Sequence, residues 1–158
     1  MINVQNARMD SDLRDIHLAM MDLVGFLNRP QADDVLLREA GVSLDRALFP
    51  LLVRIERKGP VGVVELADLA GRDHSVVSRQ VAKLESLGLV ERRPGADKRV
   101  REAVVTDKGR ALTDALDAAR QRLAGPMLER WSAQDRKDLA RLLRRFVDDA
   151  NTTIKGEE

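Results

Sequence analysis

The sequence contains no cysteine and no long hydrophobic run. Without cysteine the chain cannot form disulfides, thiolate redox centres or cysteine-liganded zinc sites, and its composition suits a reducing compartment. Acidic residues interrupt the apolar stretches of residues 1–27. This segment therefore lacks the continuous apolar core of a signal peptide or a membrane span. We expect a cytoplasmic protein without a membrane partner.

Histidine is scarce, and the motifs of common catalytic sites are missing. The two histidines, His17 and His74, fall on separate predicted helices. The sequence has no Ser-His-Asp grouping, glycine-rich phosphate loop or His-Glu metal spacing. The adjacent acid pairs at 33–34 and 148–149 point to different helix faces, which is typical of solvated charges rather than acid–base couples. We expect no catalytic residue, no metal site, no cofactor and no enzyme activity.

Charge is abundant but unevenly distributed. The chain of 158 residues is 44% hydrophobic and 34% charged, which indicates a folded domain, or one domain with appended helices. Its net charge of +1 favours no particular partner. Residues 72–110, however, hold ten Lys or Arg against six Asp or Glu, whereas residues 1–50 hold five against eight. The positive potential therefore gathers around the segment RRPGADKRV at 92–100.

Helical periodicity dominates the N-terminal part. A seam of apolar residues predicts a first helix that ends at residues 28–30; it consists of Met9, Leu13, Ile16, Met20, Leu23 and Leu27. A short helix over 33–40 should stop at Gly41. Ser43 is predicted to cap a third helix, kinked at Pro50. The buried side of that helix would carry Leu44, Leu48, Leu51, Leu52 and Ile55.

The central and C-terminal segments alternate between helices and a hairpin. Val61 predicts a short strand, followed by helices over 64–70 and from Asp73 or His74 to 87, and by strands over 89–93 and 100–105. Thr106 should open a long helix. A last helix, capped by Ser132 with Asp135, carries an apolar stripe of Leu139, Leu142, Leu143, Phe146 and Val147.

This element order predicts a mainly α fold with a small β-hairpin wing, a winged helix-turn-helix flanked by N- and C-terminal helices. The expected division is residues 1–42 for N-terminal dimerisation helices, 43–109 for the DNA-binding domain and 110–158 for C-terminal dimerisation helices. Within the helix-turn-helix, Ala67 permits close helix crossing, Gly71 permits the left-handed turn, and Val77 packs beneath the first helix.

The second helix of this motif has the pattern of a helix that enters the major groove. Small outward residues, such as Ser75, let the backbone approach the DNA. Arg79 is the candidate for a forked contact to guanine, and Lys83 for a phosphate contact. Ser75 and Ser78 can reach phosphates or base edges, and Val76 flanks them. An ordinary amphipathic surface helix and a merely solvated hairpin tip are the alternatives. The turn spacing, the small outer face and the basic hairpin together favour DNA, with Arg99 entering a minor groove.

Residues 59–109 resemble the multiple antibiotic resistance regulator (MarR) family of winged-helix transcription factors. The resemblance rests on GPVGVVELA at 59–67, SVVSRQVAKLESLGLVER at 75–92 and DKRVREAVVTDKG at 97–109. It implies that Asp97 pairs with a wing arginine and holds Arg99 for the minor groove, with Arg93 and Lys98 beside it. The chain departs from the family pattern at Gly62, where a Ser or Thr cap is common, at Lys98, where an Arg is common, and at Ala103 and Val105, where leucines are usual.

The flanking helices predict a homodimer on a pseudo-palindromic double-stranded DNA operator. The alternative is that both apolar stripes fold back on their own chain. Family resemblance further implies a small aromatic or anionic effector that releases DNA from a repressor. The residues that such a ligand would meet are His17, Met20, Met21, Phe49 and Arg54, although each is also explained as a core or surface residue. A winged helix used only for protein–protein assembly is the competing function.

Overall fold

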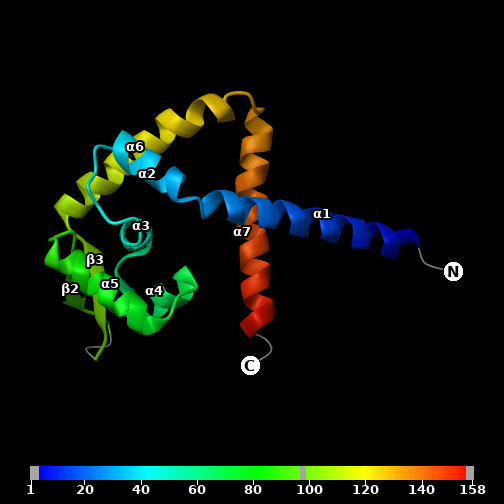
Figure 1. Ribbon diagram of the computed structural model, residues 1–158. Coiled ribbons are helices and arrows are strands. Elements are labelled where there is room, and N and C mark those ends of the chain that lie inside the picture. Colours follow the sequence, from blue (N-terminus) through cyan, green and yellow to red (C-terminus); the bar gives the residue numbers. More distant parts are fainter. Residues whose placement is uncertain (1–3, 97–98, 156–158) are drawn as a thin grey trace. The chain divides into compact units, whose positions relative to one another are not determined.

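The computed structural model describes residues 4–96 and 99–155. The chain divides into two compact units, Met1–Asp117 and Ala118–Glu158. The elements follow one another as shown in Figure 1: α1 (Val4–Leu27), α2 (Pro30–Glu39), α3 (Phe49–Lys58), β1 (Val61–Gly62), α4 (Val63–Ala70), α5 (His74–Ser86), β2 (Val90–Pro94), β3 (Arg101–Val105), α6 (Asp107–Leu128) and α7 (Ala133–Lys155). The predicted fold class is confirmed, because the mainly helical chain combines a helix-turn-helix with a small antiparallel sheet. The functional division at 42/43 and 109/110 stays a prediction.

The wing is a three-stranded antiparallel sheet with β3 in its centre, in the order β1-β3-β2. The register pairs Val61 with Ala103 and Val90 with Val105. Ala103 is buried, so the sheet turns that face towards the core. The predicted single-residue strand at Val61 is therefore the third strand of the wing.

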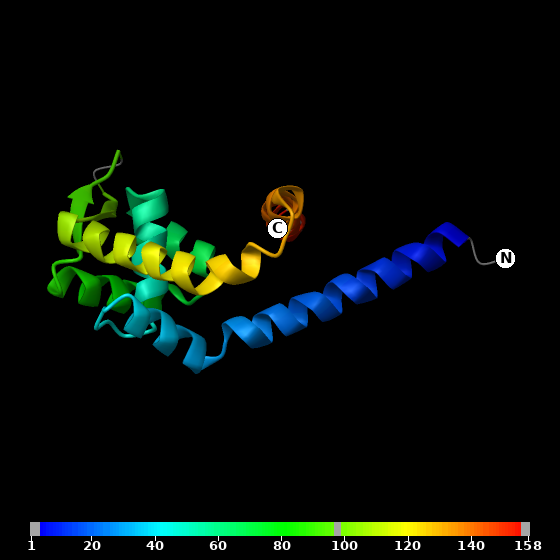
Figure 2. The ribbon, with the colours of Figure 1, turned by 90° about the horizontal axis from the view of Figure 1, so that it is seen from above.

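The helix α1 is continuous, as predicted (Figure 2). Pro30 begins the next helix. Pro30 fits there because the first turn of a helix needs no backbone donor. The helix α2 thus begins three residues before the predicted start and ends before Gly41, whose φ of 65° only glycine adopts easily. Every residue of α1 from Met9 to Leu27 is exposed.

The start predicted for the third helix was wrong. Ser43 caps no helix, and α3 begins at Phe49, so Pro50 lies in the first turn and causes no kink. Asp45 organises the preceding turn instead: its Oδ1 accepts from Ala47 N at 2.7 Å, and its carbonyl accepts from Leu48 N at 2.9 Å. The sequence pattern predicts a kink at Pro50, whereas the structure places this proline in the first turn of the helix.

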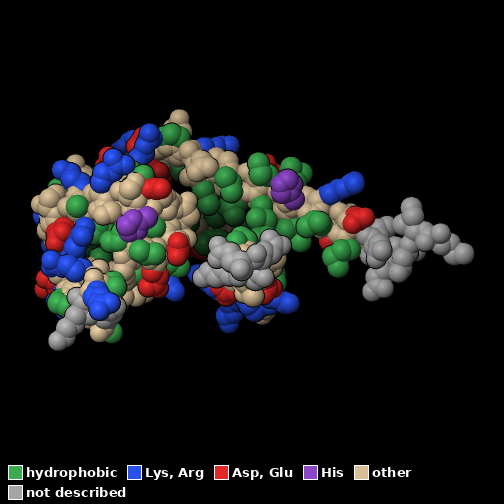
Figure 3. Space-filling view, turned by 90° about the horizontal axis from the view of Figure 1, so that it is seen from below, with side chains coloured by type: hydrophobic (Ala, Val, Ile, Leu, Met, Phe, Trp, Pro, Cys, Tyr) green, Lys and Arg blue, Asp and Glu red, His purple; other side chains and the backbone are tan. Residues whose placement is uncertain are grey.

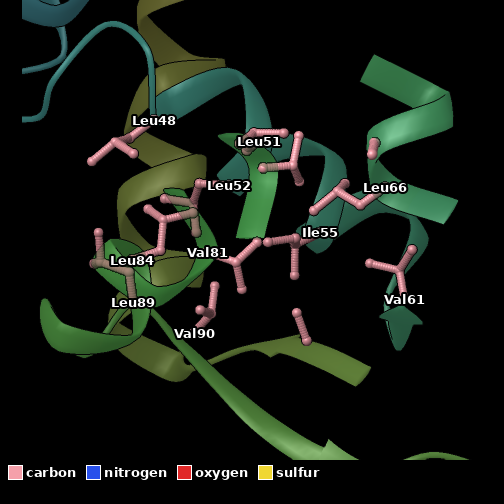
Figure 4. Packing of buried hydrophobic residues seen from close by; sticks show 13 residues of the cluster. Leu48, Leu51, Leu52, Ile55, Val61, Leu66, Val81, Leu84, Leu89 and Val90 are labelled. Carbon is pink, nitrogen blue, oxygen red and sulfur yellow. The ribbon is translucent and has the colours of Figure 1, made fainter. Parts of the chain in front are cut away.

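The main core lies between α3, the helix-turn-helix and the wing. Figure 4 shows how side chains from these elements converge. Its fully buried members include Leu52, Ile55, Leu66, Val81 and Leu84. Four of the five leucines and isoleucines predicted for the buried side of α3 belong to it, and Leu44 packs against it. A second cluster contains Leu37, Phe49 and Leu116.

The C-terminal unit contains the end of α6 and all of α7. Ser132 Oγ accepts from Asp135 N at 3.0 Å and donates to the Asp135 carboxylate at 2.6 Å, which confirms the predicted cap. The apolar stripe of α7 is exposed: its members, 41–51% exposed, are Leu139, Leu142, Leu143, Phe146 and Val147.

Substitution of Gly71 tests the turn of the helix-turn-helix. Gly71 adopts φ 59° and ψ 37°, where a Cβ costs about 1 to 2 kcal/mol. We expect Gly71→Ala to lower the free energy of unfolding by about that amount in urea titrations. Gly71→Asn is the control and should cost less, because asparagine tolerates this conformation. Equal stability of all three proteins would contradict the assignment.

Candidate nucleic-acid interface

The turn between α4 and α5 sets the crossing of the two helices. The backbone N–H groups of Gly71 and Arg72 donate to the carbonyls of Asp68 and Ala67, both at 3.1 Å. Ala67 is 3% exposed and Val77 is fully buried. The three residues predicted to define the motif therefore occupy the expected places: close crossing, left-handed turn and packing contact.

Asp73 caps α5, which resolves the choice between Asp73 and His74. Its Oδ1 accepts from the backbone N–H groups of Ser75 at 2.7 Å and Val76 at 3.3 Å, and from the Ser75 hydroxyl. These hydrogen bonds, that from the Ser75 hydroxyl first, hold the pKa of Asp73 below its ordinary value. The cap thus keeps a carboxylate at the positive end of the helix dipole.

The two faces of α5 differ in burial. Val77, Val81 and Leu84 are fully buried. Ser75, Arg79, Ala82, Lys83 and Ser86 are exposed, and Val76 and Ser78 are partly buried. Within the part of the chain that the structure describes, the Arg79 guanidinium and the Lys83 ammonium have no hydrogen-bond or ion-pair partner. Two cations thus stand on a face that otherwise carries small side chains.

The wing carries further cations. Its strand β2 lies next to α5 (Figure 1). Arg93 is 64% exposed and pairs with Glu91 on its own strand. Arg99 is exposed in the turn that follows, where Gly95 N donates to Val100 O at 2.9 Å. Asp97 and Lys98 lie outside the described residues, so the pairing expected for Asp97 stays a prediction.

Two arginines with structural roles were missed by sequence reasoning. The Arg92 side chain is only 23% exposed, and its Nε lies 3.2 Å from Glu85 Oε2 on α5, an ion pair without good hydrogen-bond alignment. Arg72 donates from Nη1 to Ala47 O at 3.2 Å and to Gln80 Oε1 at 3.4 Å. Strand alternation was the available signal for Arg92, since it lies two residues after buried Val90.

The five residues expected to meet an effector have different surroundings. His17, Met20 and Met21 are exposed on α1, and Arg54 is exposed on α3. Phe49 is 6% exposed and packs in the second core cluster. Phe49 therefore has a packing role in this structure, whatever else it contacts.

Among the helices of the described residues, none is both long enough and apolar enough to cross a membrane.

Asp73 variants test the cap of α5. Because the folded-state pKa of Asp73 is depressed, its contribution to stability is complete above the ordinary aspartate pKa of about 3.9 and is lost as the pH falls through the lower folded value. We expect Asp73→Ala to lower the thermal midpoint at pH 7, with the difference from wild type shrinking in acid. Asp73→Asn keeps an acceptor and should retain part of the cap at every pH. A difference that stays constant down to pH 2 would argue against a titrating cap.

Comparison with known proteins connects this interface to a family. The family model HVO_A0114 matches residues 44–107. YxaD of Bacillus subtilis (strain 168), an uncharacterized HTH-type transcriptional regulator, is 32% identical over 138 residues, which cover 84% of this chain and 96% of YxaD.

Solved structures extend the likeness to the flanking helices. A MarR transcriptional regulator from Methanosarcina mazei Go1 has a TM-score of 0.68 at 19% identity, with 89% of this chain and 99% of that chain covered. The crystal structure of MarR has a TM-score of 0.64 at 23% identity, with 84% and 98% covered. These structures establish the fold, and the identity with YxaD establishes the relationship in sequence. The chain belongs, with YxaD, to the HTH-type, DNA-binding transcriptional regulators, and its fold is the winged helix-turn-helix fold of the MarR structures.

Proposed function

We propose that the protein is a homodimeric, sequence-specific repressor that binds a pseudo-palindromic DNA operator in the cytoplasm and is released by a small molecule. The observation that carries the proposal is the outer face of α5, which is the proposed recognition helix. It presents two unpaired cations among small side chains, within the described residues, while the opposite stripe is fully buried. A helix of this shape fits a major groove about 12 Å wide.

Each side chain of this face is assigned a contact from its donors and acceptors. Arg79 offers the planar fork that matches guanine O6 and N7, a contact of about 1 to 3 kcal/mol of discrimination. Lys83 is a point charge suited to a phosphate. The Ser75 hydroxyl already donates to Asp73, so its free lone pairs suit a base amino group rather than a phosphate. Ser78 can donate to a phosphate, and Val76 suits a thymine methyl group.

The wing is assigned to the adjacent minor groove. Arg99 and Arg93 are exposed near the end of the hairpin, and narrow A·T-rich minor grooves concentrate negative potential. Lys98 and Asp97 belong to the same proposed contact, Lys98 as a cation and Asp97 as the partner that orients an arginine. The Arg92–Glu85 ion pair supports this arrangement because it joins the wing to the recognition helix.

Exposed apolar surface supports the proposal that two copies of the chain form a dimer. Figure 3 shows hydrophobic side chains along α1, and the members of its seam are 37–67% exposed. The stripe of α7 is also exposed. Patches of this kind are rare on monomers, and a dimer places two recognition helices on two half-sites. Assembly with a different protein is the competing use of these surfaces.

The proposed effector would meet residues of α1 and α3. His17 and Met20 on α1 and Arg54 on α3 are exposed and offer an imidazole, a thioether and a cation. Such groups suit a small aromatic or anionic compound, for which Phe49 would have to leave its core cluster or contribute only an edge.

Variants of the two recognition-helix cations separate their roles. We expect Arg79→Ala to weaken binding to the selected operator by about 5- to 100-fold and to relax sequence preference, because a base contact is lost. Lys83→Ala should weaken specific and random duplexes alike and reduce the slope of log affinity against log salt by about 0.9. Fluorescence anisotropy on both duplexes measures this. Identical behaviour of the two variants would contradict the assigned contacts, and no duplex binding at low salt would favour protein assembly instead.

A charge placed in the α7 stripe tests the dimer. We expect Phe146→Asp to yield a monomer in sedimentation velocity experiments, because an ionised carboxylate is costly in an apolar interface. Lys137→Asp makes a larger charge change on the polar face of the same helix and should leave the dimer intact. A Phe146→Asp protein that still sediments as a dimer would exclude this stripe from the interface.

A further inference from the structure

The C-terminal end of the recognition helix is held by the start of α6. Lys108 Nζ donates to Leu87 O at 2.8 Å, the Thr106 hydroxyl donates to Gly88 O at 2.7 Å, and Thr106 N donates to Leu89 O at 3.1 Å. Three successive carbonyls at and after the end of α5 thus receive donors from two residues. The end of a helix leaves such carbonyls without intrahelical partners.

The turn after α5 completes its own hydrogen bonds separately. Gly88 N donates to Glu85 O at 2.9 Å, and Leu89 N donates to Leu84 O at 3.0 Å, with Gly88 at φ 70°. This is the pattern of a glycine-terminated helix. These bonds use the carbonyls of Leu84 and Glu85. The donors from Thr106 and Lys108 therefore meet the carbonyls that follow, and they connect the helix end to another helix.

Gly109 brings the two segments into backbone contact. A Cβ at this position would lie 2.1 Å from Leu89 O and 2.7 Å from Val105 Cγ2, so no side chain fits without a shift of the backbone. Gly109 N donates to Thr106 Oγ1 at 3.1 Å. The Thr106 hydroxyl therefore accepts from the first turn of α6 and donates to the segment after α5 at the same time.

We propose that Thr106, Lys108 and Gly109 are positioning residues for operator recognition, which hold α5 at a fixed angle to α6. They lie outside the recognition helix and outside the hairpin of β2 and β3. The inference rests on the proposed function, since it needs a sequence-specific operator. Forked base contacts tolerate little angular error, so loosening of this joint reduces sequence-specific binding first. Binding to random duplex depends mainly on phosphate charge and is less sensitive to orientation.

Two conservative changes at Thr106 test the joint. Thr106→Val removes both hydrogen bonds of the hydroxyl and keeps the shape, whereas Thr106→Ser keeps both hydrogen bonds. The probes are the duplex that the wild-type protein selects from a randomised library and a scrambled duplex of equal length and composition. We expect Thr106→Val to weaken binding to the selected duplex about tenfold and to the scrambled duplex less than about twofold. Thr106→Ser should stay within about twofold of wild type on both.

Lysine variants provide a second test should Thr106→Val fold poorly. Lys108→Met removes a donor to Leu87 O together with one charge, and Lys137→Met, on the polar face of α7, removes the same charge without such a contact. We expect Lys108→Met to lower the ratio of selected to scrambled affinity and Lys137→Met to leave that ratio unchanged. Thermal unfolding of each variant gives the folded fraction at the assay temperature.

The outcomes separate this inference from the function on which it rests. Equal losses on both duplexes, in proportion to the folded fraction, would show that the joint only stabilises the fold and would overturn the positioning role. A wild-type protein that selects no sequence at low salt would overturn the proposed function, and the inference with it. Selection by the wild type, with an unchanged affinity ratio for Thr106→Val and Lys108→Met, would overturn the inference alone.

Discussion

Burial of one stripe of α5 is the constraint on which the interface depends. Val77, Val81 and Leu84 are fully buried, and each contributes about 1.5 to 3 kcal/mol by leaving water. Together they outweigh a single base contact of about 1 to 3 kcal/mol. The core, rather than the DNA, therefore decides the rotation of the helix about its axis. Because that rotation is set, Arg79 and Lys83 point outwards before any ligand arrives.

Rotation about its axis does not by itself orient a helix. Contacts at its two ends restrict the angle of α5 to the neighbouring elements. Asp73 closes the first turn, and donors from the start of α6 meet the last carbonyls. The Arg92–Glu85 ion pair adds a contact from the wing to the last turn. It is partly exposed, so its energy is small, but it restricts the angle between β2 and the helix. Core packing thus sets the rotation of α5 about its axis, and these polar contacts restrict the direction of that axis.

The helices α1 and α7 differ from α5 because their apolar stripes are exposed. On α1 and on α7, each taken by itself, large apolar side chains are exposed at helical spacing. The segment from α3 to β3 instead buries a core that includes Leu52, Leu66 and Val81. Apolar burial stabilises a fold only when another surface covers it. The relationship to YxaD supports a regulatory role for the chain, and the uncovered faces are the reason to propose a second copy.

Local sequence determined most elements and the division of α5 into two faces, because periodicity, Gly71 and Asp73 act over a few residues. It was wrong about Ser43 and Pro50, since a proline fits the interior pattern and the first turn equally well until the preceding turn is known. Tertiary structure alone decided that Arg92 pairs with α5 and that Thr106 and Lys108 meet the end of that helix. Those contacts join residues 7 to 21 positions apart, and only the packing of the sheet and α6 on one core brings them together.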